Sequence, residues 1–216
     1  MPPETGASFR DVIASLEDLA GLYGDPLPAV RAKVIDRLDR HCRDWIARSP
    51  FVLVGTSNAD GRCDVSPKGG APGFVRVLDE RRLTIPDAPG NRLVDSLRNI
   101  VANPHVGLLF LIPGLEETLR VNGRASLTRD PDLLEQLADG AKPPKVAIGV
   151  EVEEAFLHCA KAFKRSSLWL PERWPSTDGL ARPAQIWRDH MALAELTTED
   201  VQQLVDEDYA TNLEWR

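Results

Sequence analysis

The sequence predicts a mainly β protein of the α+β class, built as an antiparallel barrel with helical decorations at both ends of the chain. A dense run of strand-like segments between residues 51 and 156 is the first observation, because most of these segments lead through a turn into the next. Successive hairpins favour antiparallel pairing, and many strands with few helices favour a barrel over a doubly wound sheet. Helical spacing of apolar residues before residue 50 and after residue 181 is the second observation.

The N-terminal part of the chain is expected to form two helices. A capping signal at residues 8–11 precedes apolar residues at helical spacing from Ile13 to Leu22. Gly24-Asp-Pro26 ends that helix, and Pro28 can open a second one. The apolar stripe of the second helix would contain Val30, Val34, Leu38, Trp45 and Ile46.

The barrel itself is expected from alternating or apolar segments separated by turn residues such as Asp60-Gly61. The expected strands are 51–56, 62–66, 74–78, 82–85, 105–112, 117–128 and 146–156, with helices at 91–101 and 131–138 between them. We expect N-terminal helices packed on the barrel (1–48), the barrel (49–175) and a C-terminal helical extension (176–216), one domain overall. Thr198-Glu-Asp200 would open the last helix.

Composition and charge narrow the functional classes. The chain has 216 residues, 43% of them hydrophobic and 27% charged, which is typical of a globular protein with one core. Its apolar runs are too short to cross a bilayer, and no signal-like leader opens it, so we expect a cytoplasmic protein without a membrane partner. A formal charge of −7 argues against a broad nucleic-acid surface but allows one small basic pocket.

The cysteines and known sequence motifs exclude several kinds of site. The chain has three cysteines at wide spacing, Cys42, Cys63 and Cys159, which is neither a disulfide framework nor a zinc-binding pattern. We expect them to be buried or half-buried thiols. His158-Cys159 invites a metal or nucleophile interpretation, but neighbours on a strand point to opposite faces and no partner acid is evident. We expect no metal site. A nucleophile elbow, a Walker A motif and G-x-G-x-x-G are all absent from the sequence.

Three segments can carry chemistry, and each also has a purely structural interpretation. In Asp64–Phe74, Gly69 and Gly70 would let the backbone approach a flat ligand beside Lys68, although a turn alone would need the same residues. In 86–99, a Pro/Gly turn leads into a helix whose first turn carries Asn91 and Arg92, a phosphate-binding arrangement in which Asn91 is equally an ordinary cap.

The third segment, 158–169, concentrates positive charge in an acidic chain. Lys161, Lys164 and Arg165 precede Trp169 directly after the last long strand. A solvated basic helix face would look the same.

Together these segments resemble the pyridoxamine-phosphate-oxidase-like superfamily of flavin-binding split barrels, in its branch of probable FMN-dependent enzymes. The resemblance spans roughly Trp45 to Pro175, in the order of the family. The matching stretches are Asp64–Gly70 with Gly73-Phe74, Asp87 with Pro89–Arg92, Asp95-Ser96 with Asn99-Ile100, Asn103-Pro104, Val106–Phe110, Ile112–Gly114, Glu117–Arg124, and His158–Lys161 with Ser166 and Trp169.

The resemblance implies a six-stranded split barrel and a homodimer with FMN at the subunit interface. Ser66, Pro67, Lys68 and Gly69 would lie beside the flavin. Asn91 and Arg92 would hold the phosphate, with Ser96 and Asn99 nearby. Lys161, Arg165 and Trp169 would come from the other subunit to close the site.

The function expected from this resemblance is an FMN-dependent oxidoreductase acting on a small organic substrate, with no catalytic acid or base identified. Two alternatives stay open: a flavin carrier or sensor without turnover, and a barrel that holds haem or F420. Haem would need an axial ligand among His41, His105, His158 and His190. The C-terminal segment 182–191 lacks the Arg-Leu pattern of true pyridoxine-phosphate oxidases, which argues against vitamin B6 oxidation.

Overall fold

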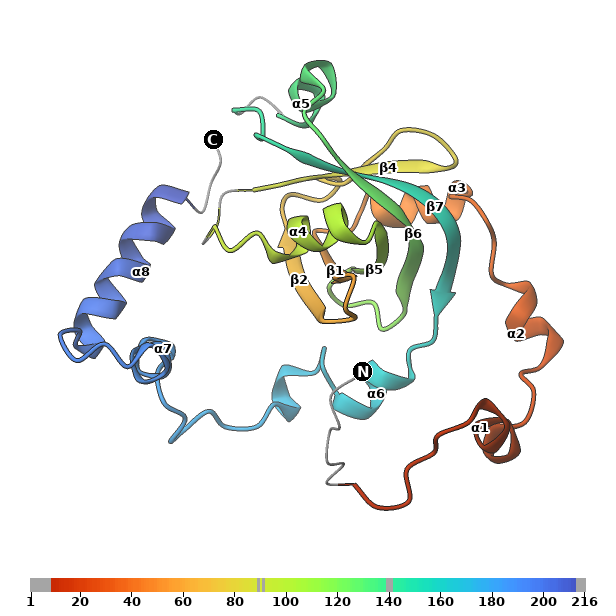
Figure 1. The fold of residues 1–216 in the computed structure, drawn as a ribbon, viewed down its shortest axis with the longest axis horizontal. Coiled ribbons are helices and arrows are strands. Elements are labelled where there is room, and N and C mark those ends of the chain that lie inside the picture. Colours follow the sequence, from red (N-terminus) through yellow and green to blue (C-terminus); the bar gives the residue numbers. More distant parts are fainter. Residues whose placement is uncertain (1–8, 89, 91, 139–141, 213–216) are drawn as a thin grey trace. The chain divides into compact units, whose positions relative to one another are not determined.

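Seven strands form a single sheet in which every hydrogen-bonded pair is antiparallel. The computed structural model describes residues 9–88, 90, 92–138 and 142–212. The strands are β1 (Phe51–Ser57), β2 (Cys63–Gly69), β3 (Arg76–Val77), β4 (Arg82–Pro86), β5 (His105–Leu111), β6 (Thr118–Thr128) and β7 (Ala147–His158). Their order is β2-β1-β5-β6-β7-β4-β3 (Figure 1). The expected antiparallel α+β fold is confirmed, with seven strands where the resemblance implied six, and β3 contains only two residues.

The chain divides into two compact units, residues 1–34 and residues 35–216. The first unit contains α1 (Leu16–Tyr23) and α2 (Pro28–Ala32), and the second contains the sheet and the other helices. These are α3 (Arg40–Ile46), α4 (Asp95–Ala102), α5 (Pro131–Leu137), α6 (Lys161–Ser166), a 3₁₀ turn (Pro171–Arg173), α7 (Pro183–Met191) and α8 (Thr198–Asn212). Among the described helices, none is both long enough and apolar enough to cross a membrane.

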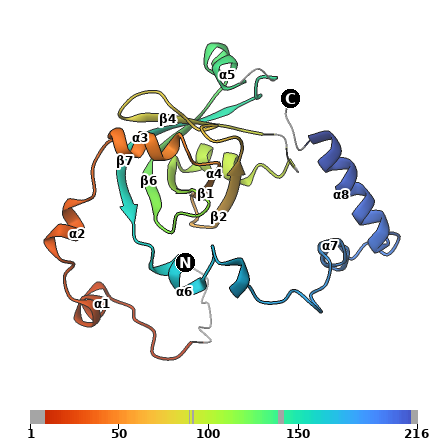
Figure 2. The ribbon, with the colours of Figure 1, turned by 180° about the vertical axis from the view of Figure 1, so that it is seen from behind.

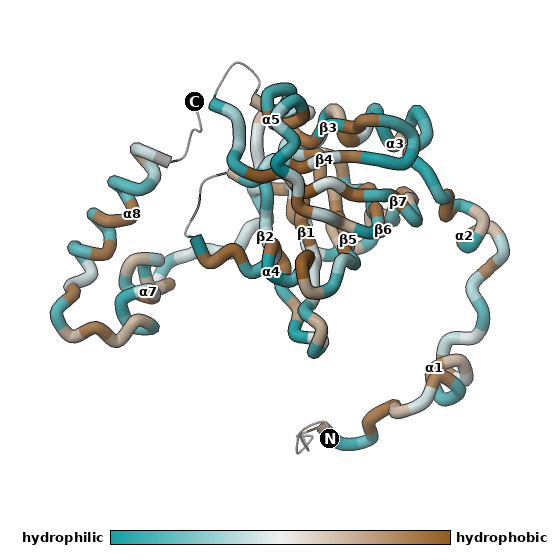
Figure 3. Tube along the Cα trace, turned by 45° about the horizontal axis from the view of Figure 1, so that its top comes forward, coloured by the Kyte–Doolittle hydropathy of each residue, from teal (hydrophilic) through white to brown (hydrophobic). Residues whose placement is uncertain are grey.

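The hydrophobic core lies inside the barrel. Alternate residues of β1 are buried, so Val52 and Val54 face inward, as period-two patterning requires. Phe110 of β5 and Ile148 of β7 are fully buried in the same cluster. Hydrophobic positions, in brown, run along the strands around β1 and β5 in Figure 3. Burial of these side chains stabilises the barrel, at about 25 cal/mol per Å² of apolar surface.

Helix α4 packs over the face of the sheet that carries Val52 and Val54, because its Ile100 belongs to the same buried cluster. It packs against β1, β2 and β6. Figure 1 shows α4 in front of these strands, and the view from behind in Figure 2 shows the strands in front of the helix. Its buried residues are Ser96 and Ile100, four positions apart and therefore on one helix face. This packing fixes the start of α4 beside β2.

The expected second helix from Pro28 to Ile46 is wrong, because the structure contains two short helices there, α2 and α3. Between them, the backbone of Ile35 forms an antiparallel bridge with Ala155 of β7, with N–O distances of 3.0 and 2.7 Å. The side chain of Asp39 then caps α3 by accepting a hydrogen bond from the Cys42 N–H at 2.8 Å. A backbone that pairs with a strand cannot also continue a helix.

The glycine-rich turn expected after Ser66 is also wrong in position. Residues Ser66–Gly69 belong to β2, which pairs with β1 along its whole length, from Cys63 opposite Ser57 to Gly69 opposite Phe51. A proline is tolerated at position 67 because β2 is an edge strand, where the missing N–H faces away from the ladder.

Candidate functional site

An ion pair connects the two separated sides of the sheet. In the strand order, β2 lies at one edge, whereas β4 lies next to β3 at the other. Lys68 of β2 reaches across to Asp87, which directly follows β4, with 3.2 Å between Nζ and Oδ1. Both side chains are mostly buried, at 19% and 24% exposure. The pair therefore marks the split at which the barrel is not closed by backbone hydrogen bonds.

A cavity of about 890 Å³ lies at this split. Its walls come from β2, the segment between β4 and α4, the first turn of α4, and the segment that leads into β7. The lining residues are Asp64, Val65, Ser66, Pro67, Lys68, Asp87, Ala88, Gly90, Arg92, Leu93, Val94, Asp95, Ser96, Leu97, Lys142, Pro143, Pro144, Lys145, Asp208 and Thr211. Five of the predicted cofactor residues line this cavity, namely Ser66, Pro67, Lys68, Arg92 and Ser96. Gly69 does not line it.

One face of β2 is polar along the cavity. Asp64, Ser66 and Lys68 alternate with exposed residues and are half-buried, so they share a side of the strand. Lys68 is held by Asp87, as described above, and Asp64 accepts a hydrogen bond from Ser96 of α4 at 2.5 Å. The strand therefore presents a hydroxyl, an ammonium and a carboxylate beside the cavity.

The polar face of α4 contacts the barrel in a row. Ser96 donates to Asp64, and the Asn99 amide donates to the buried Thr56 hydroxyl at 3.0 Å. One turn later, Asn103 donates to Ser57 at 3.0 Å. Ser96 lines the cavity, whereas Asn99 anchors the helix to β1 and is outside the lining. The predicted roles of both residues near a phosphate stay predictions.

The segment before α4 has unusual backbone angles. Arg92 and Val94 both have positive φ values, 63° and 51°, which are costly for residues with a Cβ, and most of all for a β-branched one. Such strain costs about 1–3 kcal/mol for each residue and tends to occur at ligand sites. Because of these angles α4 begins at Asp95, so the expectation that Arg92 lies in the first helical turn is wrong. Asn91 lies outside the described residues.

Two lysines of the cavity were not identified from the sequence. Lys142 and Lys145 flank Pro143-Pro144 in the segment between α5 and β7, and both are exposed. The signal that could have found them is a pair of cations around two rigid prolines in an acidic chain. The two lysines were missed because nothing in the sequence near residue 142 shows how close this segment comes to β2.

The predicted glycine contacts have a different physical basis from the one expected. A Cβ at Gly70 would come within 2.9 Å of the Phe74 side chain, so this glycine allows Phe74 to pack closely. At Gly69 a Cβ would make ordinary contacts of 3.5 Å with Pro50 O and 3.8 Å with Phe51. Neither glycine lines the cavity.

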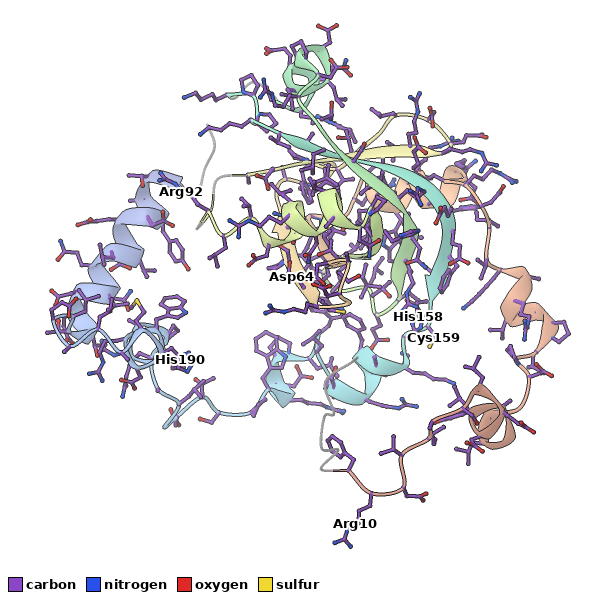
Figure 4. All side chains as sticks on the ribbon, in the orientation of Figure 1. Arg10, Asp64, Arg92, His158, Cys159 and His190 are labelled. Carbon is purple, nitrogen blue, oxygen red and sulfur yellow. The ribbon has the colours of Figure 1, made fainter. Side chains whose placement is uncertain are left out.

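The third predicted segment lies at a different end of the barrel. Lys161 and Arg165 of α6 are exposed, and Trp169 donates from Nε1 to the Leu115 carbonyl at 2.8 Å. Figure 4 shows Arg92 far from His158 and Cys159, which mark the end of β7 just before α6. None of the three predicted residues lines the cavity of the same chain.

The three cysteines are free thiols that differ in exposure. Cys42 is buried, and burial raises the pKa of its thiol to about 11. Cys63 and Cys159 are exposed, so the expectation of buried or half-buried thiols is wrong for these two, which lie at strand ends. Among the described residues, no group of three or more His, Cys, Asp or Glu side chains could hold a metal ion.

Several solved structures are similar to this chain at low sequence identity. HupZ from Group A Streptococcus is 20% identical with a TM-score of 0.46, over 55% of this chain and 92% of that protein. A putative pyridoxamine 5'-phosphate oxidase from Lactobacillus delbrueckii is 21% identical with a TM-score of 0.44, over 56% and 99%. An FMN-binding protein from Syntrophomonas wolfei is 8% identical with a TM-score of 0.45, over 56% and 89%.

The family assignment comes from the sequence profile of a known family. No curated protein matches the chain. The profile described as "Pyridoxamine 5'-phosphate oxidase" matches residues 38–159, which is more than half of the chain and includes all seven strands and α4. The match also contains most of the cavity wall, from Asp64 to Lys145. The chain therefore belongs to the pyridoxamine 5'-phosphate oxidase family.

Proposed function

We propose that the protein binds FMN in the cavity at the split and acts as an FMN-dependent oxidoreductase on a small organic molecule. One observation carries the proposal: the polar face of β2 and Arg92, which has no ion pair within the described chain, line the same cavity. Flavin sites need polar groups beside a flat ring and a cation for a phosphate. Family membership supports a cofactor of this type.

The chemistry of the lining residues fits FMN. Ser66, Pro67 and Lys68 would lie beside the flavin ring and the ribityl chain, where hydroxyl and ammonium donors suit ring oxygens and nitrogens. Arg92 would hold the phosphate, because a guanidinium fork matches phosphate oxygens and the N-terminus of α4 adds a favourable dipole. A volume of about 890 Å³ is within the roughly 300–1,000 Å³ of small-molecule sites.

The protein's own residues would orient FMN, and FMN would supply the hydride or electron transfer. The Lys68–Asp87 pair holds the ammonium in one place across the split. The contact between Ser96 and Asp64 fixes α4, and with it the approach to Arg92, against β2. Electrostatics and position are therefore the contributions that this chain makes to the reaction.

The proposal includes a homodimer. Lys161 and Arg165 belong to α6, and Trp169 follows it. Helix α6 begins just after His158 and Cys159, which lie far from Arg92 in Figure 4. The residues of α6 and Trp169 could reach an FMN site at the split only from a second copy. This is the arrangement that the sequence resemblance implies.

Haem is a weaker candidate for this cavity than FMN. The lining contains no histidine, cysteine, methionine or tyrosine among the described residues, so no side chain there offers a common axial ligand. Vitamin B6 oxidation is not part of the proposal, because segment 182–191 lacks the Arg-Leu pattern that the resemblance would require.

Native mass spectrometry of the purified protein tests the proposal, with the Arg92→Gln variant beside it. We expect a yellow protein containing two chains and two FMN molecules, which releases FMN on denaturation. Arg92→Gln should weaken FMN binding by roughly 10- to 100-fold, since a charge-assisted hydrogen bond contributes about 1.5–3 kcal/mol. Arg40→Gln is the matched control, because Arg40 is 81% exposed on α3 and neither it nor its partner Asp44 lines the cavity.

The outcomes separate the parts of the proposal. A colourless protein that does not bind added FMN would rule out the flavin site. Unchanged FMN affinity in Arg92→Gln would show that the phosphate lies elsewhere. Anaerobic reduction by NAD(P)H, followed by a screen of quinones and other acceptors, separates an enzyme from a flavin carrier. A protein that only carries flavin would be reduced by none of these donors.

A further inference from the structure

Helices α7 and α8 form a hairpin that lies outside the residues matched by the family profile, which end at residue 159. The two helices pack against each other, and Ala184 of α7 and Val201 of α8 are buried. An ion pair of 3.1 Å between Arg182 and Glu199 also joins the start of α7 to the start of α8. The family match accounts for the barrel but not for this hairpin.

The hairpin exposes several large apolar side chains. Trp187 and Met191 are four positions apart on α7 and therefore lie on one helix face. The exposed apolar residues of the hairpin, each between 42% and 56% exposed, are Trp187, Met191, Leu193, Leu204 and Tyr209. A single exposed apolar side chain is ordinary, but a group of this size on two short helices indicates a surface that another molecule covers.

Helix α8 is also strongly acidic. It contains no basic residue and five acidic ones, Glu199, Asp200, Asp206, Glu207 and Asp208. Within the described chain, Asp206 and Glu207 accept hydrogen bonds from the neutral amides of Gln202 and Gln203, at 2.9 and 2.8 Å, and form no ion pair. Their negative charge is thus not offset, and α8 suits a surface that is both apolar and cationic.

The α6 end of the barrel, which comprises Leu115 and residues 161–174, has the complementary composition. Lys161 and Arg165 are exposed one turn apart on α6, and neither forms an ion pair within the described part of the chain. The indoles of Trp169 and Trp174 hold the surrounding turns together through hydrogen bonds to backbone carbonyls. The apolar side chains of this end, between 38% and 56% exposed, are Leu115, Leu168, Leu170 and Trp174.

The hairpin reaches the cavity, whereas α6 lies elsewhere on the same chain. Asp208 and Thr211 of α8 line the cavity together with Arg92. Figure 4 shows Arg92 far from His158 and Cys159, after which α6 begins. We infer that the α7–α8 hairpin of one copy docks on the α6 end of a second copy, beside the cavity. This inference rests on the homodimer of the proposed function, in which α6 of the second copy comes to the split.

The apolar surface available suits a stable dimer. A two-fold dimer contains the contact twice, because each copy offers one hairpin and one α6 end. Covering a side chain of this size from about half exposure removes roughly 30–60 Å² of apolar surface. The exposed apolar residues of both regions would together remove roughly 300–500 Å² per copy, and a standard interface buries about 800 Å² per partner, a little over half of it apolar.

Zero-length cross-linking of mixed dimers tests the contact directly. Isotope-labelled and unlabelled full-length chains are mixed, allowed to exchange and treated with a carbodiimide, which joins a carboxylate to a lysine amine in direct contact. We expect peptides of opposite isotope label that join Asp206 or Glu207 to Lys161. Lys164 and Glu116 are bonded within one chain, so their cross-link should carry a single label and serves as the internal control.

Charge reversal measures how much the contact contributes to dimerisation. Asp206→Lys/Glu207→Lys and Lys161→Glu/Arg165→Glu should each weaken the dimer by roughly tenfold or more in sedimentation velocity, because like charges would face each other. Combining the two pairs should recover most of the loss. The control, Asp60→Lys/Glu135→Lys, reverses two exposed acids outside the hairpin and the α6 end and should dimerise like the wild type. Circular dichroism melts verify that each variant is folded.

Several results would overturn the inference. A monomeric wild type, a cross-link to Lys161 that carries only one isotope label, or an unchanged dimer constant in the α8 variant would each do so. Weakening by both reversals without recovery in the combination would show that the two helices do not face each other. FMN content per chain in the same samples tests the proposed cofactor separately, because a dimer joined by the hairpin but free of FMN would contradict only the flavin site.

Discussion

The two ends of the barrel carry similar basic residues but use them in different ways. At the cavity end, Arg92 has no ion-pair partner in the described chain. At the α6 end, Lys164 is bonded to Glu116, and Trp169 donates to the Leu115 carbonyl and stacks on Phe163, with 5.7 Å between ring centroids. A basic cluster in a sequence therefore does not by itself indicate a binding site. The two ends differ in whether a cation such as Arg92 or Lys164 already has a partner within the described chain.

The basic and aromatic residues of α6 and the segment after it also differ in whether they form contacts within the chain. Lys164 and Trp169 are used to attach α6 to the turn around Leu115. Lys161 and Arg165 remain exposed and are the side chains that a second copy of the chain could use. Lys164 and Trp169 therefore hold α6 in place within the chain, whereas Lys161 and Arg165 lie on its exposed surface.

The contact between Asp64 and Ser96 should contribute more to stability than the ion pairs Lys68–Asp87 and Lys164–Glu116. Asp64→Ala would leave the buried Ser96 hydroxyl without its acceptor, which costs about 2 kcal/mol of unfolding free energy. Asp64→Asn keeps an acceptor oxygen and should lose less. Urea unfolding followed by fluorescence measures both variants, and Val65→Ala at an exposed position of the same strand is the control. Equal losses of unfolding free energy in Asp64→Asn and Asp64→Ala would show that the negative charge of Asp64, and not its hydrogen-bond acceptor oxygen, holds α4 in place.

The Lys68–Asp87 pair should have an intermediate effect. Its side chains are less exposed than those of surface pairs, so a double-mutant cycle with Lys68→Gln and Asp87→Asn should give a coupling energy of about 1 kcal/mol. The cycle is measured by urea unfolding of the four proteins. The exposed pair of Arg82 and Asp79 provides a comparison cycle with a smaller coupling. A coupling of zero for Lys68 and Asp87 would mean that this ion pair does not help to hold the two sides of the split together.

The sequence predicted the strands well because their signal is local. The buried strand around Phe110 and the long strands β6 and β7 were each placed to within about two residues, since alternation and apolar runs belong to the segment itself. The helix that continued through Ile35 was wrong because its backbone pairs with Ala155, a contact over more than a hundred residues. Long-range pairing overrides a helical pattern that is only local.

The candidate site was predictable where residues are neighbours in the chain and not where they meet only in space. Ser66 to Lys68 and Arg92 were found from motifs and family resemblance, and they line the cavity. Lys145 was missed because its proximity to Lys68 depends on Asp87, which contacts Val146 and Lys68 at the same time. The left-handed backbone at Val94 was equally unpredictable, because nothing in a valine indicates a positive φ.

The Lys164–Glu116 pair at the α6 end should have the smallest effect. The hydrogen bond and charge of Glu116 raise the pKa of Lys164 above its ordinary value. Since the pKa is higher in the folded state, the pair stabilises the fold below the ordinary lysine pKa, and this contribution is lost as pH rises through the raised pKa. Both groups are solvent-accessible, so Lys164→Gln should lower the melting temperature by less than about 2 °C at neutral pH. The difference from the wild type should vanish in alkaline melts, and a difference that grows with pH would contradict this assignment of charge.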